Sequence, residues 1–232
     1  RGLTFSNTLQ RANRGQSIMR NVEWISSVSM ESNRISQTKW VQLQNPTAIP
    51  SGALTGENDG IFLPGQYISD LIIDGKPVNM YTKLLTEHVF DESWSQHRFF
   101  LGAEWTFDKN FGQGQLYDTQ RPPSPSMSVR PRKFNSIPAN QELSFFAEDR
   151  MSWMIGLHAF EILAGFRGSK MLGLHKQYVG LNKWNIDPRI NFSWELPTAN
   201  FLGEPLQARI DAGWGRASRR PTMSQISPDP LY

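Results

Sequence analysis

The sequence predicts an all-β, antiparallel fold, built as a meander of about nine long strands. Apolar residues recur at every second position along most of the chain, which is the spacing of a strand with one apolar face. No segment keeps helical spacing over three turns, and the candidate strands, of roughly 8 to 13 residues, exceed the usual 5 to 6. Aromatic residues make up 12% of the 232 residues, whereas charged residues make up only 19%.

The composition excludes several classes of protein. The chain has no cysteine, which excludes disulfide frameworks and thiolate metal or redox sites. Its 24 basic and 21 acidic residues give a net charge of +3, a balance too mild to indicate a nucleic-acid partner. No apolar run approaches the roughly 18 residues that a membrane-spanning helix needs, so a helical membrane protein is not expected.

The nine strand candidates follow one another along the chain. In order they span residues 3–10, 18–30, 35–43, 80–90, 98–107, 143–153, 160–167, 189–196 and 206–215. The clearest alternation lies in 189–196, where Ile190, Phe192 and Trp194 point one way and polar residues point the other. The candidate over 143–153 alternates as well, but Asp149 interrupts its apolar side.

The two predicted faces differ in an informative way. The polar face carries Gly, Asn, Ser and Gln together with charges of both signs, rather than the Lys, Glu and Thr of a water-facing sheet. The apolar face has tryptophans at or near strand ends, at Trp105, Trp153, Trp194 and Trp214. Long alternating strands with an apolar outside, a polar inside and aromatic margins are typical of a transmembrane β-barrel.

The connections between the predicted strands alternate between short and long. The short links span 91–96, 154–158 and 197–205, whereas the long ones lie near 44–75, 108–140 and 168–187. Outer-membrane barrels alternate tight periplasmic turns with long outer loops in the same manner. If the short links face the periplasm, all three long loops emerge on the outer side.

The C-terminal third resembles a known protein family. The stretches Asn185–Pro197 and Gly213–Met223 look like the barrel of TonB-dependent outer-membrane receptors. In that family a Pro-Arg-x-x-x-x-Tyr-x-x-Pro strand turns back into a strand and loop of the form Gly-x-Gly-x-x-x-Arg-x-Pro-Thr. Leu143–Asp149 and Leu163–Arg167 resemble the preceding hairpin, and Phe100–Gly114 fits less specifically. The overall style is similar to the long transporters of the Bacteroidetes type.

The resemblance implies a transport function in the bacterial outer membrane. Residues 1–232 would be a segment of one barrel domain, without the plug domain and the remaining strands of the family. The whole receptor would import a solute such as a siderophore, cobalamin or glycan, energised by a TonB-type complex through N-terminal parts absent from this sequence. Its other partners would be outer-membrane lipid and a surface lipoprotein, with no nucleic acid, cofactor or enzymatic activity.

The residues themselves leave an alternative of a different class open. A soluble β-sandwich module could bind carbohydrate or another ligand through exposed aromatic residues. That alternative predicts that Trp105, Trp194 and Trp214 lie in a closed core or on one binding platform. No nucleophile, nucleotide-binding or zinc-binding motif occurs in the sequence. Four histidines are scattered one per element and are not expected to be metal ligands: His88, His97, His158 and His175.

Charged residues fall into two groups, and neither group assigns a ligand-binding residue. On the predicted polar face, the charged residues could line a substrate path or form structural ion pairs between strands: Arg167, Glu161, Arg189, Glu195, Arg209 and Asp211. The basic loop 121–133 could attract an anionic solute or lipid, or could be a Pro-rich solvated loop that its charge keeps extended.

Overall fold

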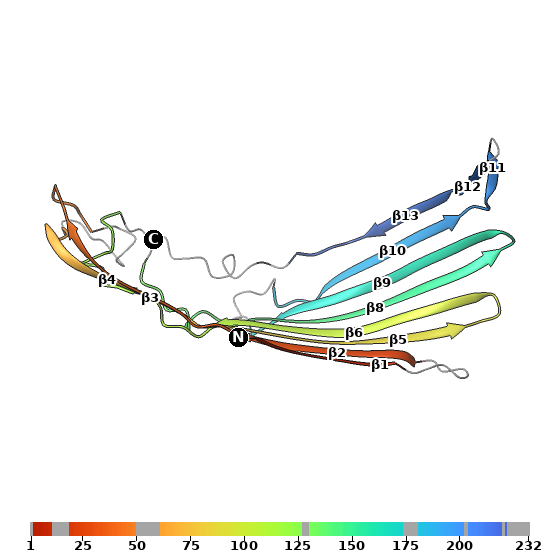
Figure 1. The fold of residues 1–232 in the computed structure, drawn as a ribbon, viewed down its shortest axis with the longest axis horizontal. Helices are drawn as coiled ribbons and strands as arrows, with labels where there is room; N and C mark the ends of the chain where they lie inside the picture. Colours follow the sequence, from red (N-terminus) through yellow and green to blue (C-terminus); the bar gives the residue numbers. More distant parts are fainter. Residues whose placement is uncertain are drawn as a thin grey trace.

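The computed structural model describes residues 2–10, 19–49, 61–126, 130–173, 181–201, 204–219 and 221. Over these residues the chain is all-β and antiparallel, as predicted, and its strands lie side by side in open sheets (Figure 1). The described residues contain no helix that is long and apolar enough to cross a membrane.

Eight strands form the main sheet. In spatial order they are β1 (Gly2–Gln10), β2 (Met19–Met30), β5 (Pro77–Asp91), β6 (Ser95–Asn110), β8 (Asn140–Ile155), β9 (His158–Leu172), β10 (Asn185–Glu195) and β13 (Arg209–Gly215). Spatial order follows chain order, and every neighbouring pair is antiparallel, so the sheet is a meander. These eight strands and β3 (Asn33–Gln42) match the nine predicted strands.

A three-stranded extension continues the main sheet beyond one end, where it is formed by β3, β4 (Gln66–Gly75) and β7 (Gly114–Tyr117). Two residues separate β2 from β3, and Lys76 alone separates β4 from β5. The antiparallel pair β2–β5 of the main sheet therefore continues as the antiparallel pair β3–β4 of the extension. Figure 1 shows β3 and β4 running away from the eight main strands.

The extension has a small core of its own. Val41, Ile49, Leu63 and Tyr67 are buried against one another. The Tyr67 hydroxyl donates a hydrogen bond of 3.0 Å to the carbonyl of Pro122, which is fully buried. Burial also raises the pKa of the Tyr67 phenol above its ordinary value of 10.0. A segment far along the chain therefore holds the extension together.

The predicted long loops are partly wrong. The loop 44–75 contains the ten-residue strand β4, and the loop 108–140 contains β7. The sequence of β4 does not alternate cleanly, because its buried residues include the polar Ser69 and Asp74 while the apolar Ile68 is exposed on the other face. The third loop is shorter than 168–187, because β9 reaches Leu172 and β10 starts at Asn185. The link 197–205 likewise contains a short hairpin, β11 (Ala199–Phe201) with β12 (Glu204–Leu206).

The predicted alternation of short and long connections is present only in part, because the link 196–208 between β10 and β13 is as long as the link 173–184 between β9 and β10. The links 92–94 and 156–157 join β5 to β6 and β8 to β9 at one end of the sheet, called here the short-turn end. The links 31–76, 111–139 and 173–184 leave the opposite end, called here the long-loop end (Figure 1). Strand parity in a meander places successive links at alternate ends whatever their length, and the link 196–208 leaves the short-turn end.

The main sheet has one apolar and one polar face. The cross-strand register places Trp153, Phe160, Trp194 and Ile210 in one row on the apolar face. Much of this face is exposed, including Leu101, Phe145, Phe166, Ile190 and Trp214, of which Trp214 is 64% exposed. All extensive contacts between the described strands join hydrogen-bonded neighbours, so no second sheet covers this face there.

Aromatic side chains on the apolar face form two lines. Near the short-turn end, Phe160 stacks on Trp153 and Trp194 with centroid distances of 5.5 and 6.0 Å. Toward the long-loop end, an oblique line of aromatic residues crosses the strands: Trp105 on β6, Phe145 on β8, Phe166 on β9 and Trp214 on β13. The register shows that this line shifts along the strands toward the short-turn end at each step, by six residues between Trp105 and Trp214.

Candidate functional site

The polar face of the main sheet carries the densest set of charged side chains. Most of its ion pairs join different strands, since opposite charges attract across a sheet. Among the pairs below, Arg209 and Glu195 alone face each other directly in the register. The pairs are Arg98 with Glu87, Arg150 with Glu161, Arg167 with Glu104 and Glu142, Arg189 with Glu148, and Arg209 with Glu195 and Asp211. All six charged residues singled out in the sequence lie on this face, and five of them appear in these cross-strand pairs.

The most connected arginine is Arg209, at the start of β13. Its Nε lies 2.8 Å from Asp211 Oδ1, and its guanidinium also donates to Ser193 Oγ at 2.7 Å and to Glu195 Oε1 at 3.4 Å. Ser193 in turn donates to Asp211. The strand register explains this cluster, because Glu195 faces Arg209 and Ser193 faces Asp211 across the β10–β13 pair.

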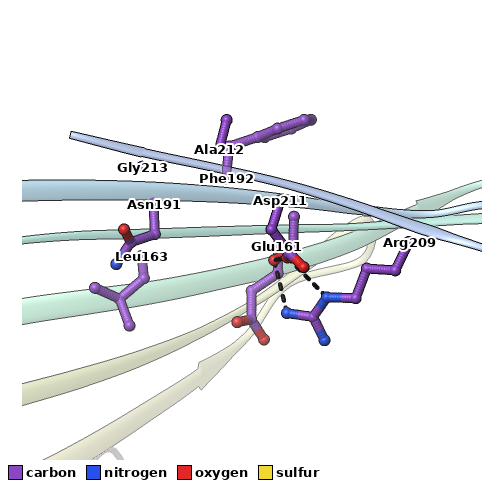
Figure 2. Close-up of a pocket in the computed structure, with 9 residues that line it drawn as sticks. Glu161, Leu163, Asn191, Phe192, Arg209, Asp211, Ala212 and Gly213 are labelled. Carbon is purple, nitrogen blue, oxygen red and sulfur yellow. Dashed lines mark hydrogen bonds and ion pairs between the residues drawn. The ribbon is translucent and has the colours of Figure 1, made fainter.

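This cluster borders a hollow of about 360 Å³ on β9, β10 and β13. Figure 2 shows Arg209 and Asp211 directed toward each other near Glu161, with Asn191 and Leu163 farther along the same hollow. The hollow offers hydroxyl, carboxylate, amide and guanidinium groups on an open surface. Such a lining can hydrogen-bond a polar solute or a neighbouring protein surface, and it has both donors and acceptors to do so.

A second arginine cluster lies nearer the long-loop end. Arg167 Nη2 lies 3.3 Å from Glu104 Oε1 and 3.2 Å from Ser144 Oγ, and Ser144 donates to Glu142 at 2.7 Å. The side chain of Glu142 is only 3% exposed, and its Oε1 lies 3.9 Å from Arg167 Nη2. Glu104 and Glu142 were not selected from the sequence, because a single carboxylate in an alternating strand carries no distinguishing signal.

The apolar face holds one hydrogen-bonded acid–base pair. His97 Nδ1 on β6 lies 2.9 Å from Asp149 Oδ2 on β8, and the His97 ring stacks on Phe99 with a centroid distance of 5.9 Å. The signal for this pair was present in the sequence, since Asp149 breaks the apolar alternation of its strand. The pairing itself required the register between the two strands.

The other histidines make separate contacts. Trp194 Nε1 donates to His158 Nδ1 at 3.1 Å, and His88 Nε2 lies 3.1 Å from Thr86 Oγ1. His175 lies outside the described residues. Within the described residues, no three His, Asp or Glu side chains gather closely enough to hold a metal ion.

The basic loop 121–133 is partly packed onto the extension. Pro122 is buried, and Gln115 and Arg132 exchange two backbone hydrogen bonds of 2.9 Å. Over these residues the loop is therefore folded against β7, rather than held extended in solvent by its charge. Residues 127–129 of the loop lie outside the described residues.

Comparisons with known proteins do not identify the chain. No protein-family model, no curated protein and no solved structure matches it. Trp105, Trp194 and Trp214 lie on the same face of the main sheet, and none of them is enclosed in a core. The geometry of the two faces is therefore the main evidence on function.

Proposed function

We propose that the chain forms part of the wall of a transmembrane β-barrel in the bacterial outer membrane, within a TonB-dependent receptor that imports a solute. The observation that carries this proposal is the exposed apolar face of the eight-stranded sheet. Eight strands about 4.8 Å apart give this face an area on the order of 1,000 Å², beyond the roughly 300–600 Å² of the largest patch on a soluble monomer. Lipid is the medium in which such a surface is stable.

The aromatic lines support a membrane-spanning orientation. On β8, Phe145 and Trp153 are eight residues apart, which is about 26 Å along a strand. At a tilt of about 40° this spacing covers about 20 Å across the bilayer, close to the roughly 25 Å apolar band between the aromatic girdles of outer-membrane barrels.

The oblique aromatic line toward the long-loop end supports strands that are tilted relative to the bilayer normal. Between Trp105 and Trp214 the line moves six residues, about 20 Å, while it crosses four strand spacings of about 4.8 Å each. Aromatic residues at one depth in a membrane would follow such a line if the strands were tilted by about 45°. The row of Trp153, Phe160 and Trp194 near the short-turn end runs straight across the strands, so the tilt rests on the oblique line alone. The strand ends at the long-loop end shift in the same direction. The last residue of β13, Gly215, pairs with Arg189, which lies four residues after the first residue of β10.

The polar face of the main sheet supports the proposal that this face lines the lumen of the barrel. Cross-strand ion pairs cover it, and polar residues face inward in large outer-membrane barrels. The short-turn end would then face the periplasm, and the long-loop end would face the cell exterior. The receptor family itself rests on the resemblance of Asn185–Pro197 and Gly213–Met223, and the three-stranded extension would be part of a large outer loop structure.

The proposal is tested on the full-length protein in its own cells. We expect it to sediment with the outer membrane, to resist extraction by alkaline carbonate, and to show heat-modifiable migration on gels. We also expect the purified protein to bind the periplasmic domain of TonB in a pull-down assay. Recovery of the full-length protein in the soluble fraction would overturn the membrane assignment, and failure to bind TonB would overturn the receptor class alone.

A further inference from the structure

A row of cations lies on the apolar face of the main sheet, beyond the oblique aromatic line and toward the long-loop end. Its members, called here the cation row, are Lys76 before β5, Lys109 on β6, Lys170 on β9 and Arg216 after β13. Each lies two or four residues from an apolar-face residue of the same stretch of chain, and an even separation along a strand keeps side chains on one face. In the same order, these apolar-face residues are Val78, Trp105, Phe166 and Trp214.

Lys76 and Arg216 belong to the ladder of the main sheet although they lie just outside its strands. The Lys76 carbonyl accepts a hydrogen bond of 2.9 Å from the Phe111 N–H, and the Arg216 N–H donates one of 2.9 Å to the Pro188 carbonyl. The Nζ atom of Lys109 lies 5.4 Å from the centroid of the Phe111 ring, which places its ammonium group at the same edge of the sheet. The backbone of the sheet therefore positions all members of the row.

The cation row runs parallel to the oblique aromatic line. From Lys109 to Lys170 the row crosses two strand spacings and shifts four residues toward the short-turn end, and it does the same from Lys170 to Arg216. Between Trp105 and Phe166 the aromatic line also shifts by two residues at each strand. Over these strands the two lines stay four residues apart, which is about 13 Å along a strand.

This separation gives the row a depth in the barrel proposed above. With strands tilted by about 45°, 13 Å along a strand corresponds to about 9 Å along the bilayer normal. The aromatic line marks the edge of the hydrocarbon layer, and the headgroup region beyond that edge is about 5–8 Å thick. Long basic side chains adjust their charged ends to this region. The row therefore lies at headgroup level, in the leaflet on the side of the cell exterior.

The charge of the cation row is largely unbalanced. Lys76 Nζ lies 3.8 Å from Asp74 Oδ2, and the side chain of Asp74 is 8% exposed. Lys109, Lys170 and Arg216 form no ion pair with another described residue. On the two strands that lie between its members, the row passes through uncharged residues: Gln141 on β8 and Ile186 on β10.

The opposite margin of the same face is different. From β5 to β13, the described residues of the apolar face toward the short-turn end include no lysine or arginine, and the ionisable side chains there are three histidines and Asp149. The positive charge is therefore confined to the margin that would enter the outer leaflet. In the bacterial outer membrane that leaflet is built of phosphorylated glycolipid, whose charge is complementary to the row.

We infer that the cation row binds the phosphate groups of the outer-leaflet glycolipid. This inference rests on the proposed membrane-barrel function and names the lipid that one margin of the barrel recognises. Lys76 and Lys109 lie about 8 Å apart along the sheet, and the other neighbours in the row about 16 Å apart. A small anion can contact two of these residues at most, whereas a line of headgroups can contact all of them. Ammonium and guanidinium groups give phosphate oxygens strong, charge-assisted hydrogen bonds.

Lipid binding by the full-length protein in a neutral detergent tests the row. The probe is monophosphoryl lipid A, the reference is the same lipid with its phosphate removed, and native mass spectrometry counts the bound molecules. We expect the protein to prefer the phosphorylated lipid. Lys109→Gln should lower binding of this lipid about fivefold, and the combination with Lys170→Gln and Arg216→Gln should remove the preference.

Two further variants are controls for charge and for packing. Lys39→Gln, Arg121→Gln and Lys133→Gln together remove the same charge from exposed residues of the extension, and this variant should keep the preference. Lys109→Arg combined with Lys170→Arg should also keep it, because guanidinium groups bind phosphate as well.

A site-resolved measurement does not depend on any variant. In phosphatidylcholine nanodiscs that contain monophosphoryl lipid A, acetylation of the Lys109 and Lys170 amines should be several-fold slower than with the dephosphorylated lipid. Acetylation of Lys39, on the extension, and of Lys83, on the polar face, should proceed at the same rate with both lipids.

The outcomes separate this inference from the proposed function. Equal binding of the two lipids, an equal loss of binding in the extension variant, or uniform protection of all four lysines overturns the assignment of the row. Displacement of the lipid by an equal concentration of inorganic phosphate also overturns it, because the row would then bind free anions. Each of these results leaves a membrane-embedded barrel intact. A full-length protein found in the soluble fraction overturns the inference together with the membrane function on which it rests.

Discussion

Phe146 of β8 lies directly over Gly102 of β6, its register partner on the polar face. A Cβ atom at Gly102 would overlap the Phe146 ring, lying 2.6 Å from its Cε1 and closer still to its Cζ. The pair places an aromatic ring over a glycine that would otherwise leave a gap in the strand, a device known to stabilise sheets.

Gly102→Ala should therefore destabilise the protein by about 1–3 kcal/mol, because the new methyl group displaces the ring. The measurement is urea unfolding of the full-length protein in lipid vesicles. In the Phe146→Ala background the same change should cost little, since the obstructing ring is gone. Gly65→Ala is the control, because a Cβ there meets nothing within 4 Å. Equal costs for Gly102→Ala in both backgrounds would show that the ring is not the cause.

The depth of the apolar face can be measured with a charged probe. Leu101→Arg introduces a cation between the two aromatic lines, whereas Ile155→Arg introduces one at the short-turn end of β8. In a membrane barrel the first should cost about 2–4 kcal/mol and the second about 0–1 kcal/mol. Both side chains are exposed, at 45% and 62%, so a water-facing sheet predicts small and similar costs for the two. Vesicle unfolding curves of the two variants distinguish these cases.

The two arginine clusters should respond differently to loss of charge. Arg167→Met removes a partner of Glu142, whose side chain is 3% exposed, and we expect a cost of about 1–3 kcal/mol. Arg209→Met removes an arginine whose carboxylate partners are more than half exposed, so a much smaller loss is expected. Thermal melts of both variants in detergent provide the comparison. A larger loss for Arg209→Met would contradict this assignment of the buried network.

The extension should become less stable in alkaline solution. Because burial raises the folded-state pKa of Tyr67 above 10.0, its contribution is complete below pH 10 and is lost as the pH rises through the folded-state value. Hydrogen exchange of β3 and β4 amides, measured at increasing pH and corrected for the intrinsic rate, should show this loss. Tyr67→Phe should lower protection by about 1 kcal/mol at neutral pH, because the Pro122 carbonyl loses its donor, and should reduce the alkaline step. The remainder of the step belongs to Tyr117 on β7, whose pKa burial also raises. If the loss of protection at high pH were as large in the Tyr67→Phe variant as in the original protein, another group would be its cause.

Much of the main sheet could be predicted from the sequence because its strands obey one local rule. Ile190, Phe192 and Trp194 alternate with polar residues, and this period of two is a property of each strand alone. Strand β4 does not follow the rule, because Tyr67 and Ser69 are buried by contacts with β3 and with Pro122, 55 residues away. Its side chains were therefore placed by tertiary contacts that no local pattern encodes.

The sequence by itself determined that this protein is an antiparallel meander with two unlike faces, because alternation assigns each side chain to a face without reference to any other strand. Only the tertiary structure decided which residues on a face meet. The register brings Arg167 within reach of Glu104 across β8 and His97 within reach of Asp149, and it aligns Trp105, Phe145, Phe166 and Trp214 along one oblique line. Register depends on how neighbouring strands slide past each other, and a shift of two residues would preserve every face while it separated each of these pairs.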